Sequence, residues 1–223
     1  MVILGLDTTG NTLSVALSED TKILGETSIN DTKKHSETLL PVLNGLLEVL
    51  GRELSEVGLI SVAVGPGSFT GIRIGVATAK GLAHALGVPV AQIDTLDGLL
   101  QNVFFDGTIC AIMDARRNQV YTAAKNRNTV VVPSCAVEID SLLTMLGEGP
   151  VLFVGDGIDH YRETIEERRP DSFFAAPPVR YQRASSVCTL GYRKSLEGDV
   201  CGYHQVQANY LRPSQAERLK RDV

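Results

Sequence analysis

The sequence has no tryptophan, few aromatic residues and only four cysteines, and none of its apolar runs is long. The cysteines include no pair at C-x-x-C spacing, which argues against a zinc site. We expect free thiols in a reducing compartment, with Cys110 buried in an apolar run. No apolar run approaches the ~18 residues of a membrane span, and the first residues lack the basic leader of a signal peptide. We therefore expect a cytoplasmic protein without a membrane segment.

The charge balance is slightly acidic: the 223 residues carry a formal net charge of −5, and 21% of them are charged. A protein that binds nucleic acid by itself usually presents a basic patch, so an RNA partner would depend on another subunit for most phosphate contacts. The histidines, His35, His84, His160 and His204, include no pair four residues apart, so no zincin-type metal site is predicted. A G-x-S-x-G nucleophile motif is absent as well.

The first half of the chain has the pattern of three strands followed by alternating helices and strands. Short apolar runs bounded by turn residues predict strands at 2–6, 12–17, 22–28, 59–64 and 88–93. Capping residues and apolar periodicity predict helices over 36–50, 68–86 and 94–100. We expect Ser36 and Ser68 to cap the first two of these helices, and Gly51 and Gly87 to end them.

The second half repeats this order of elements, although not its letters. Strands are predicted at 109–114, 119–125, 129–133 and 151–154, and helices over 141–146, 159–168 and 184–196. Two such halves predict a duplicated α/β fold of the actin-like (ASKHA, ribonuclease H-like) type, with two lobes and a cleft between them. We assign residues 1–103 to the first lobe and 104–223 to the second. The polar tail from Pro213 could pack back on the first lobe.

A glycine-rich loop, Gly65-Pro66-Gly67-Ser68-Phe69-Thr70-Gly71, lies between a predicted strand and a predicted helix. Free N–H groups at a helix N-terminus make such a loop a candidate anion site. It is neither a Walker A loop nor a G-x-G-x-x-G loop. The alternative is a tight turn where the helix crowds the strand. The Gly155-Asp156-Gly157 turn resembles an adenosine loop.

Two aspartates, Asp7 and Asp114, each end the first strand of a half. In an actin-like plan these carboxylates face nucleotide phosphates through Mg²⁺ or water, and Thr8 and Thr9 suit a phosphate-binding hairpin. However, two arginines follow Asp114 where close approach to a phosphate needs small residues. We name Asp7, Thr8, Thr9 and Asp114 as candidate cofactor-binding residues, and we expect no ATP turnover by the isolated chain.

The predicted helices 36–50 and 68–86 are apolar on more than one side, unlike a surface helix with a single buried face. In the second helix Gly71, Gly75, Ala79 and Ala83 recur every four residues, which would let another backbone approach closely. One explanation is that both helices are buried. We favour the other, in which their outer faces form a helix-on-helix protein interface.

Several segments in order, 3–9, 35–41, 65–75, 111–121 and 210–212, resemble the TsaB (YeaZ) family. The resemblance spans the whole chain and is most specific in the run GPGSFTGIRIG; over 126–205 it rests on layout alone. It implies an actin-like fold and a non-catalytic protein that activates TsaD. That enzyme transfers a threonylcarbamoyl group to adenosine 37 of tRNAs reading codons that start with A.

The resemblance also implies the partners: TsaD in a heterodimer, TsaE, and the threonylcarbamoyl-adenylate synthase of the same pathway. It implies tRNA contact only through the complex and no cofactor in the isolated chain. It leaves open whether the free chain is a monomer or a homodimer, and whether a nucleotide binds at the TsaD interface. It places that interface on the two apolar helices. We predict the contact residues to be His35, Leu39, Leu43, Leu46, Leu50, Phe69, Ile72, Arg73, Val76 and Lys80.

The catalytic relative carries a His-x-x-x-His metal pair after the corresponding strand, and Thr95 and Leu99 stand at those positions here. Neither side chain can replace an imidazole ligand, so we predict no catalytic residue and no metal site. Two alternatives stay open. A small-molecule kinase or ATPase of the same fold would hydrolyse ATP, and a metallopeptidase would contain zinc or iron.

Overall fold

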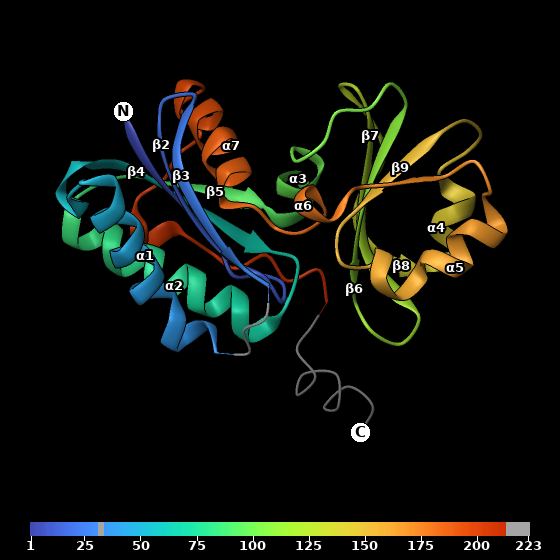
Figure 1. Cartoon of the computed structure of the whole chain (residues 1–223), viewed down its shortest axis with the longest axis horizontal. Coiled ribbons are helices and arrows are strands. Elements are labelled where there is room, and N and C mark those ends of the chain that lie inside the picture. Colours follow the sequence, from blue (N-terminus) through green and yellow to red (C-terminus); the bar gives the residue numbers. More distant parts are fainter. Residues whose placement is uncertain (31–33, 213–223) are drawn as a thin grey trace.

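The computed structural model describes residues 1–30 and 34–212. It contains two five-stranded sheets, one per lobe, which lie side by side with helices on their faces (Figure 1). The strand orders are β3-β2-β1-β4-β5 and β10-β9-β6-β7-β8. The predicted duplicated α/β fold is therefore confirmed.

The first sheet begins as an antiparallel meander, to which two parallel strands are added. Its strands are β1 (Val2–Asp7), β2 (Leu13–Glu19), β3 (Lys22–Ile29), β4 (Val57–Gly65) and β5 (Val90–Asp94). Helices α1 (His35–Leu50) and α2 (Phe69–Leu86) cover one face, and α7 (Ala184–Leu196) covers the other (Figure 1). The alternation along β1 produces both cores, because Leu4 and Leu6 face α1 and α2 whereas Ile3 faces α7.

The second sheet repeats this topology, with β9 parallel to β6 as β4 is to β1. Its strands are β6 (Thr108–Asp114), β7 (Gln119–Asn126), β8 (Thr129–Glu138), β9 (Val151–Val154) and β10 (Phe173–Phe174). Helices α4 (Ile139–Met145) and α5 (Ile158–Arg168) cover one face. The short helix α3 (Thr95–Leu100) packs on the other face, between the lobes, and α6 (Pro177–Arg180) lies beside it (Figure 1).

Helix α7 packs on the first sheet although it lies within the predicted second lobe of 104–223. Gly5 permits its close approach, since a Cβ there would lie 2.5 Å from both the carbonyl oxygen of Ala184 and the sulfur of Cys188. Farther along, Cys201 forms a β-bridge with Val90. The range 104–223 therefore joins two packing units, and the chain returns to the first lobe at α7.

Several predicted details differ from the structure. Helix α1 begins at His35, and Lys34 occupies the N-cap position without a side-chain hydrogen bond, so Ser36 as N-cap is wrong. Ser68 does cap α2, accepting a hydrogen bond from the Gly71 amide. The strand predicted at 129–133 continues to Glu138. Four short elements were not predicted: β10, α6 and two 3₁₀ turns at 54–56 and 203–205.

Cys110 is buried as expected, and all four cysteines are free thiols. No helix within the described ranges is long and apolar enough to cross a membrane. The predicted polar tail from Pro213 lies outside the described residues.

Candidate functional site: the inter-lobe cleft and the outward helix face

A cavity of about 550 Å³ opens between the two lobes. Its walls come from the β1–β2 turn, the start of α2, the turn after β6, the start of α5 and residues 209–212. The carboxyl ends of β1 and β6 both point here, as the actin-like plan predicts. The polar groups that line the cavity therefore come from both halves of the duplicated fold.

At the carboxyl end of β1, the polar side chains point into the first lobe. The carboxylate of Asp7 is buried and accepts hydrogen bonds from the amide and the hydroxyl of Thr9, at 2.9 and 2.7 Å. Burial raises the pKa of Asp7 to about 6. The hydroxyl of Thr8 donates to the carbonyl of Gly71 at 2.7 Å. Of the four candidate cofactor-binding residues only Asp114 lines the cavity; Asp7, Thr8 and Thr9 hold the β1–β2 turn against α2.

At the carboxyl end of β6, the polar side chains are more exposed to solvent. Asp114 accepts a hydrogen bond from the Arg116 amide at 2.8 Å, and the ring nitrogen Nε2 of His160 lies 4.0 Å from its other carboxylate oxygen. Asp156, in the glycine turn after β9, also lines the cavity, and its Oδ1 has no hydrogen-bond partner in the described structure. Within residues 1–30 and 34–212, no three His, Cys, Asp or Glu side chains are grouped closely enough to hold a metal ion.

Burial raises the pKa of Asp156 to about 6, and the charge of Asp114 adds to this effect. The folded chain therefore holds this proton more tightly than the unfolded chain does. The stability that it contributes is full below about pH 4 and is lost as the pH rises towards about 6. We expect Asp156→Asn to remove roughly 1 kcal/mol of the stability difference between pH 5 and pH 7, measured by urea unfolding. An identical pH dependence in both proteins would contradict this prediction.

The glycine-rich loop packs against the β1–β2 turn. The Ser68 amide donates to the Thr9 carbonyl at 2.7 Å, and a Cβ added at Gly67 or Gly71 would overlap the backbone of Thr9 or Thr8. These contacts favour the tight-turn explanation for the glycines over an anion site. The loop still contributes Ser68 and Phe69 to the cavity wall.

The predicted partner contacts lie on different sides of α1 and α2. Six of the ten residues are buried in the first lobe, namely His35, Leu39, Leu43, Leu46, Ile72 and Val76. They face inward because α1 and α2 pack on the sheet with these sides, and His35 Nε2 lies 2.9 Å from the carbonyl oxygen of Gly10. The remaining four, Leu50, Phe69, Arg73 and Lys80, are at least partly accessible.

The stripe of small residues on α2 also faces inward. Gly75 is buried, and a Cβ there would lie 2.5 Å from the hydroxyl of Thr8. The backbone that approaches this stripe closely therefore belongs to the same lobe and not to a partner.

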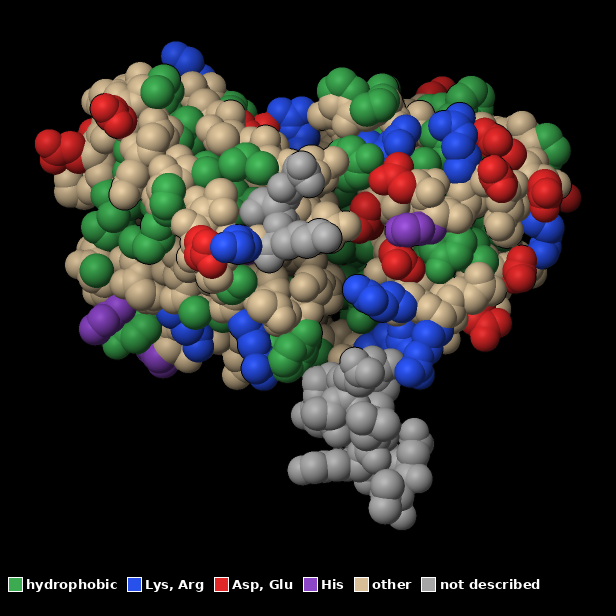
Figure 2. Space-filling model, turned by 60° about the horizontal axis from the view of Figure 1, so that its bottom comes forward, with side chains coloured by type: hydrophobic (Ala, Val, Ile, Leu, Met, Phe, Trp, Pro, Cys, Tyr) green, Lys and Arg blue, Asp and Glu red, His purple; other side chains and the backbone are tan. Residues whose placement is uncertain are grey.

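The opposite sides of α1 and α2 form what we call the outward helix face. Its exposed residues include Leu40, Gly45 and Val49 of α1 and Ala77 and Gly81 of α2. Val49 is 85% exposed. In the view of Figure 2, the first lobe shows fewer charged side chains than the second.

Gly45 and Gly81 lie inside helices, yet the chain itself gives no steric reason for them. A Cβ at either position would meet no atom within 4 Å. A glycine in a helix interior costs about 1 kcal/mol relative to alanine. The sequence did not predict a role for either glycine, because both lie outside the stripe of small residues that recur every four positions on α2.

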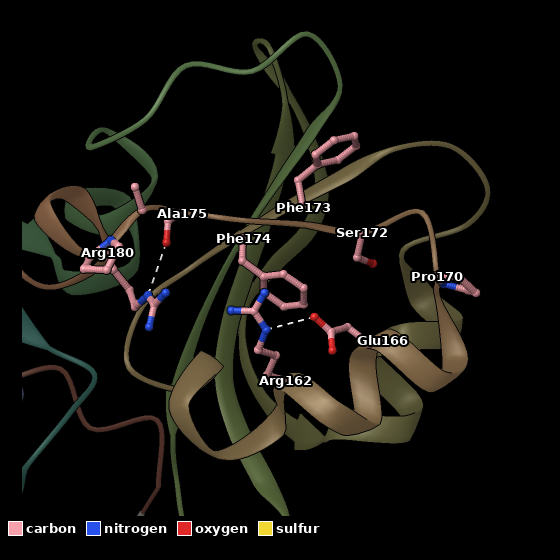
Figure 3. Close-up of a pocket in the computed structure, with 10 residues that line it drawn as sticks. Arg162, Glu166, Pro170, Ser172, Phe173, Phe174, Ala175 and Arg180 are labelled. Carbon is pink, nitrogen blue, oxygen red and sulfur yellow. Dashed lines mark hydrogen bonds and ion pairs between the residues drawn. The ribbon is translucent and has the colours of Figure 1, made fainter.

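A second hollow, of about 650 Å³, lies beside the edge strand β10 (Figure 3). Its charged groups are already paired. Arg162 bonds Glu166 at 2.8 Å and lies over the Phe174 ring, and Arg180 bonds Asp159 at 2.8 Å. We attribute these contacts to packing of the second lobe.

The two lobes and their cleft define an actin-like protein. A ROK hexokinase from Thermus thermophilus shares the fold, with a TM-score of 0.52 and 10% identity over 89% of this chain and 100% of that chain. YeaZ from Pseudomonas aeruginosa is more similar, with a TM-score of 0.79 and 25% identity over 94% of this chain and 99% of that chain.

Sequence comparison identifies the family. A family model described as TsaD, tRNA N6-adenosine threonylcarbamoyltransferase, matches residues 22–191. The tRNA threonylcarbamoyladenosine biosynthesis protein TsaB of Bacillus subtilis is 35% identical over 97% of this chain and 96% of its own length. The chain belongs to the TsaB family, as its motifs predicted.

Proposed function

We propose that this chain acts in the formation of threonylcarbamoyladenosine on tRNA, as a non-catalytic subunit that binds and activates TsaD. The name of the B. subtilis relative supports the pathway. Thr95 and Leu99 support the non-catalytic role, because both are buried in α3 and neither can serve as an imidazole-like metal ligand. TsaE and the threonylcarbamoyl-adenylate synthase act with the complex, and tRNA binds to the complex and not to this chain alone.

The observation that carries the partner role is the pair of glycines on the outward helix face. Gly45 and Gly81 have open space around them in the single chain, so their helix-weakening cost is best explained by a backbone that approaches from another protein. The TsaD family model matches a range that includes both helices, so TsaD carries corresponding helices. A heterodimer of related subunits would then pack like helices against one another across a pseudo-two-fold axis.

Reconstitution tests the function. Labelled threonine incorporation into tRNA is measured with the other pathway components, with and without this chain. We expect product only when the chain is present, and neither product nor ATP turnover from the chain alone. An unchanged rate and yield on adding the chain would exclude the activator role.

A further inference from the structure

Four arginines in or beside the wall of the inter-lobe cavity form no ion pair with any carboxylate in the described parts of the chain. Arg116 and Arg212 line the cavity, Arg73 contacts the lining residues Phe69 and Tyr210, and Arg117 follows Arg116. Six other arginines each lie within 4 Å of an aspartate or glutamate: Arg52, Arg127, Arg162, Arg168, Arg180 and Arg183. The chain is acidic overall, yet half of its twelve described arginines have no carboxylate within 4 Å. Arg169 and Arg193 are the other two, and both bond to carbonyl or amide oxygens elsewhere, so four of these six arginines lie together. An unneutralised group of four at one place therefore calls for an explanation.

On the first lobe, Arg73 is part of an aromatic cluster. Its guanidinium carbon lies 3.9 Å from the centre of the Phe69 ring, and its Nε donates to the hydroxyl of Tyr210 at 3.2 Å. The two rings are 5.0 Å apart, and Phe69 and Tyr210 are 37% and 39% exposed. The cluster holds a positive charge beside two partly exposed aromatic rings.

The last described residues connect this cluster to the second lobe. Arg212, two residues after Tyr210, donates to the carbonyl oxygen of Ala115 at 2.8 Å. Ala115 precedes Arg116 and Arg117, which are exposed. These contacts produce one continuous surface across the cavity mouth, which we call the arginine rim: Arg73, Arg116, Arg117 and Arg212 with Phe69 and Tyr210. Figure 2 shows Lys and Arg side chains gathered along the lower edge, on both sides of the boundary between the lobes.

The turn that carries two of these arginines is strained. Arg116, Arg117 and Asn118 have φ values of 62°, 56° and 59°, a left-handed conformation that glycine adopts easily and arginine does not. The Arg116 amide is held by Asp114 and its carbonyl by the Gln119 amide, so the conformation is fixed. Such backbone strain is typical of functional positions. Here it presents two exposed guanidinium groups beside the cavity.

Guanidinium groups next to partly exposed aromatic rings are suited to a nucleic acid strand, whose phosphates pair with arginine and whose bases stack on rings irrespective of sequence. We propose that the arginine rim contacts the phosphate backbone of the substrate tRNA when this chain is bound to TsaD; this inference rests on the proposed function. The rim adds a few contacts to a complex whose other subunit supplies most of them, which agrees with the acidic charge of this chain. An acidic protein segment would also neutralise the arginines, but it would not make use of the partly exposed rings.

The test uses the complete complex with TsaD and an unmodified transcript of a tRNA that reads codons starting with A. The dissociation constant is measured over a range of salt concentrations for wild type and for the Arg116→Glu, Arg117→Glu double variant. We expect binding about tenfold or more weaker near 0.15 M salt, and a slope of log affinity against log salt that is smaller by about 1 to 2. Tyr210→Ala should weaken binding without changing the slope, since it removes stacking and no charge. Arg193→Glu, which makes half of this charge change at an exposed site on α7, should leave both quantities unchanged.

Two results would overturn the proposal. One is an unchanged affinity and salt slope in the double variant, with the heterodimer intact by size-exclusion chromatography. The other is loss of TsaE binding with normal tRNA affinity, which would make the rim a protein docking site. The proposed function fails separately, if wild-type chain has no effect on threonine incorporation.

Discussion

Replacing Ala77 with glutamate is expected to abolish the complex with TsaD while the chain stays folded. Ala77 is exposed on the outward helix face, and glutamate is almost as good a helix former as alanine. In a helix-on-helix interface the new carboxylate would be buried without a partner, at a cost of about 3–5 kcal/mol. That cost corresponds to an affinity at least about a hundredfold lower. Calorimetric titration with TsaD measures the affinity, and thermal unfolding by circular dichroism verifies the fold.

Two control variants locate the effect. Leu196→Glu places the same charge on an exposed residue of α7, on the opposite side of the first sheet, and should bind TsaD normally. Leu43→Asp should unfold the chain, because Leu43 is 1% exposed in the core beneath α1. If Ala77→Glu bound TsaD as tightly as wild type, the outward helix face would not be the interface.

For α1 and α2, the sequence predicted the helices but not which of their sides packs on the sheet. Apolar residues at many positions of 36–50 and 68–86 predicted two helices correctly, and a surplus of apolar surface on them. They could not tell which side meets the sheet, because Leu40 and Leu43 are equivalent until the helix is placed on its sheet. The regular stripe from Gly71 to Ala83 predicted a close backbone approach, and that approach occurs within the lobe. The isolated Gly45 and Gly81, by contrast, have no atom of this chain within 4 Å of an added Cβ.

At the cleft, the sequence indicated Asp114 because it ends a strand, a local feature. It did not single out the carboxylate of Asp156, since that position depends on β9 pairing in parallel with β6 across a long connection. The sequence also did not predict that α7 packs on the first lobe. Helix periodicity predicted its residues, 184–196, but its contact with β1 joins segments about 180 residues apart, for which the sequence carries no local signal.

The second large effect is expected at Glu26, which attaches α7 to the first sheet. Glu26 lies on β3 with its side chain only 10% exposed. Its carboxylate accepts hydrogen bonds from the guanidinium of Arg183, from the amide and hydroxyl of Ser185 at 2.9 Å each, and from the hydroxyl of Ser14 at 3.3 Å. A carboxylate at a helix N-terminus is also favoured by the helix dipole. One side chain thus holds the first turn of α7 through several bonds.

We expect Glu26→Ala to lower the free energy of unfolding by about 3–5 kcal/mol, because it leaves a partly buried arginine and a helix N-terminus without their acceptor. This is a large fraction of the stability of a typical domain, and urea unfolding measures it. As a control, Glu166→Ala removes an exposed ion pair with Arg162 and should cost less than about 1 kcal/mol. Amide exchange in α7 should accelerate in Glu26→Ala more than exchange in α1 or α2, because the lost bonds are at the start of α7. A loss below 1 kcal/mol, or exchange that accelerates equally in all three helices, would mean that apolar packing against Ile3 and Ala16 holds α7 in place without the carboxylate.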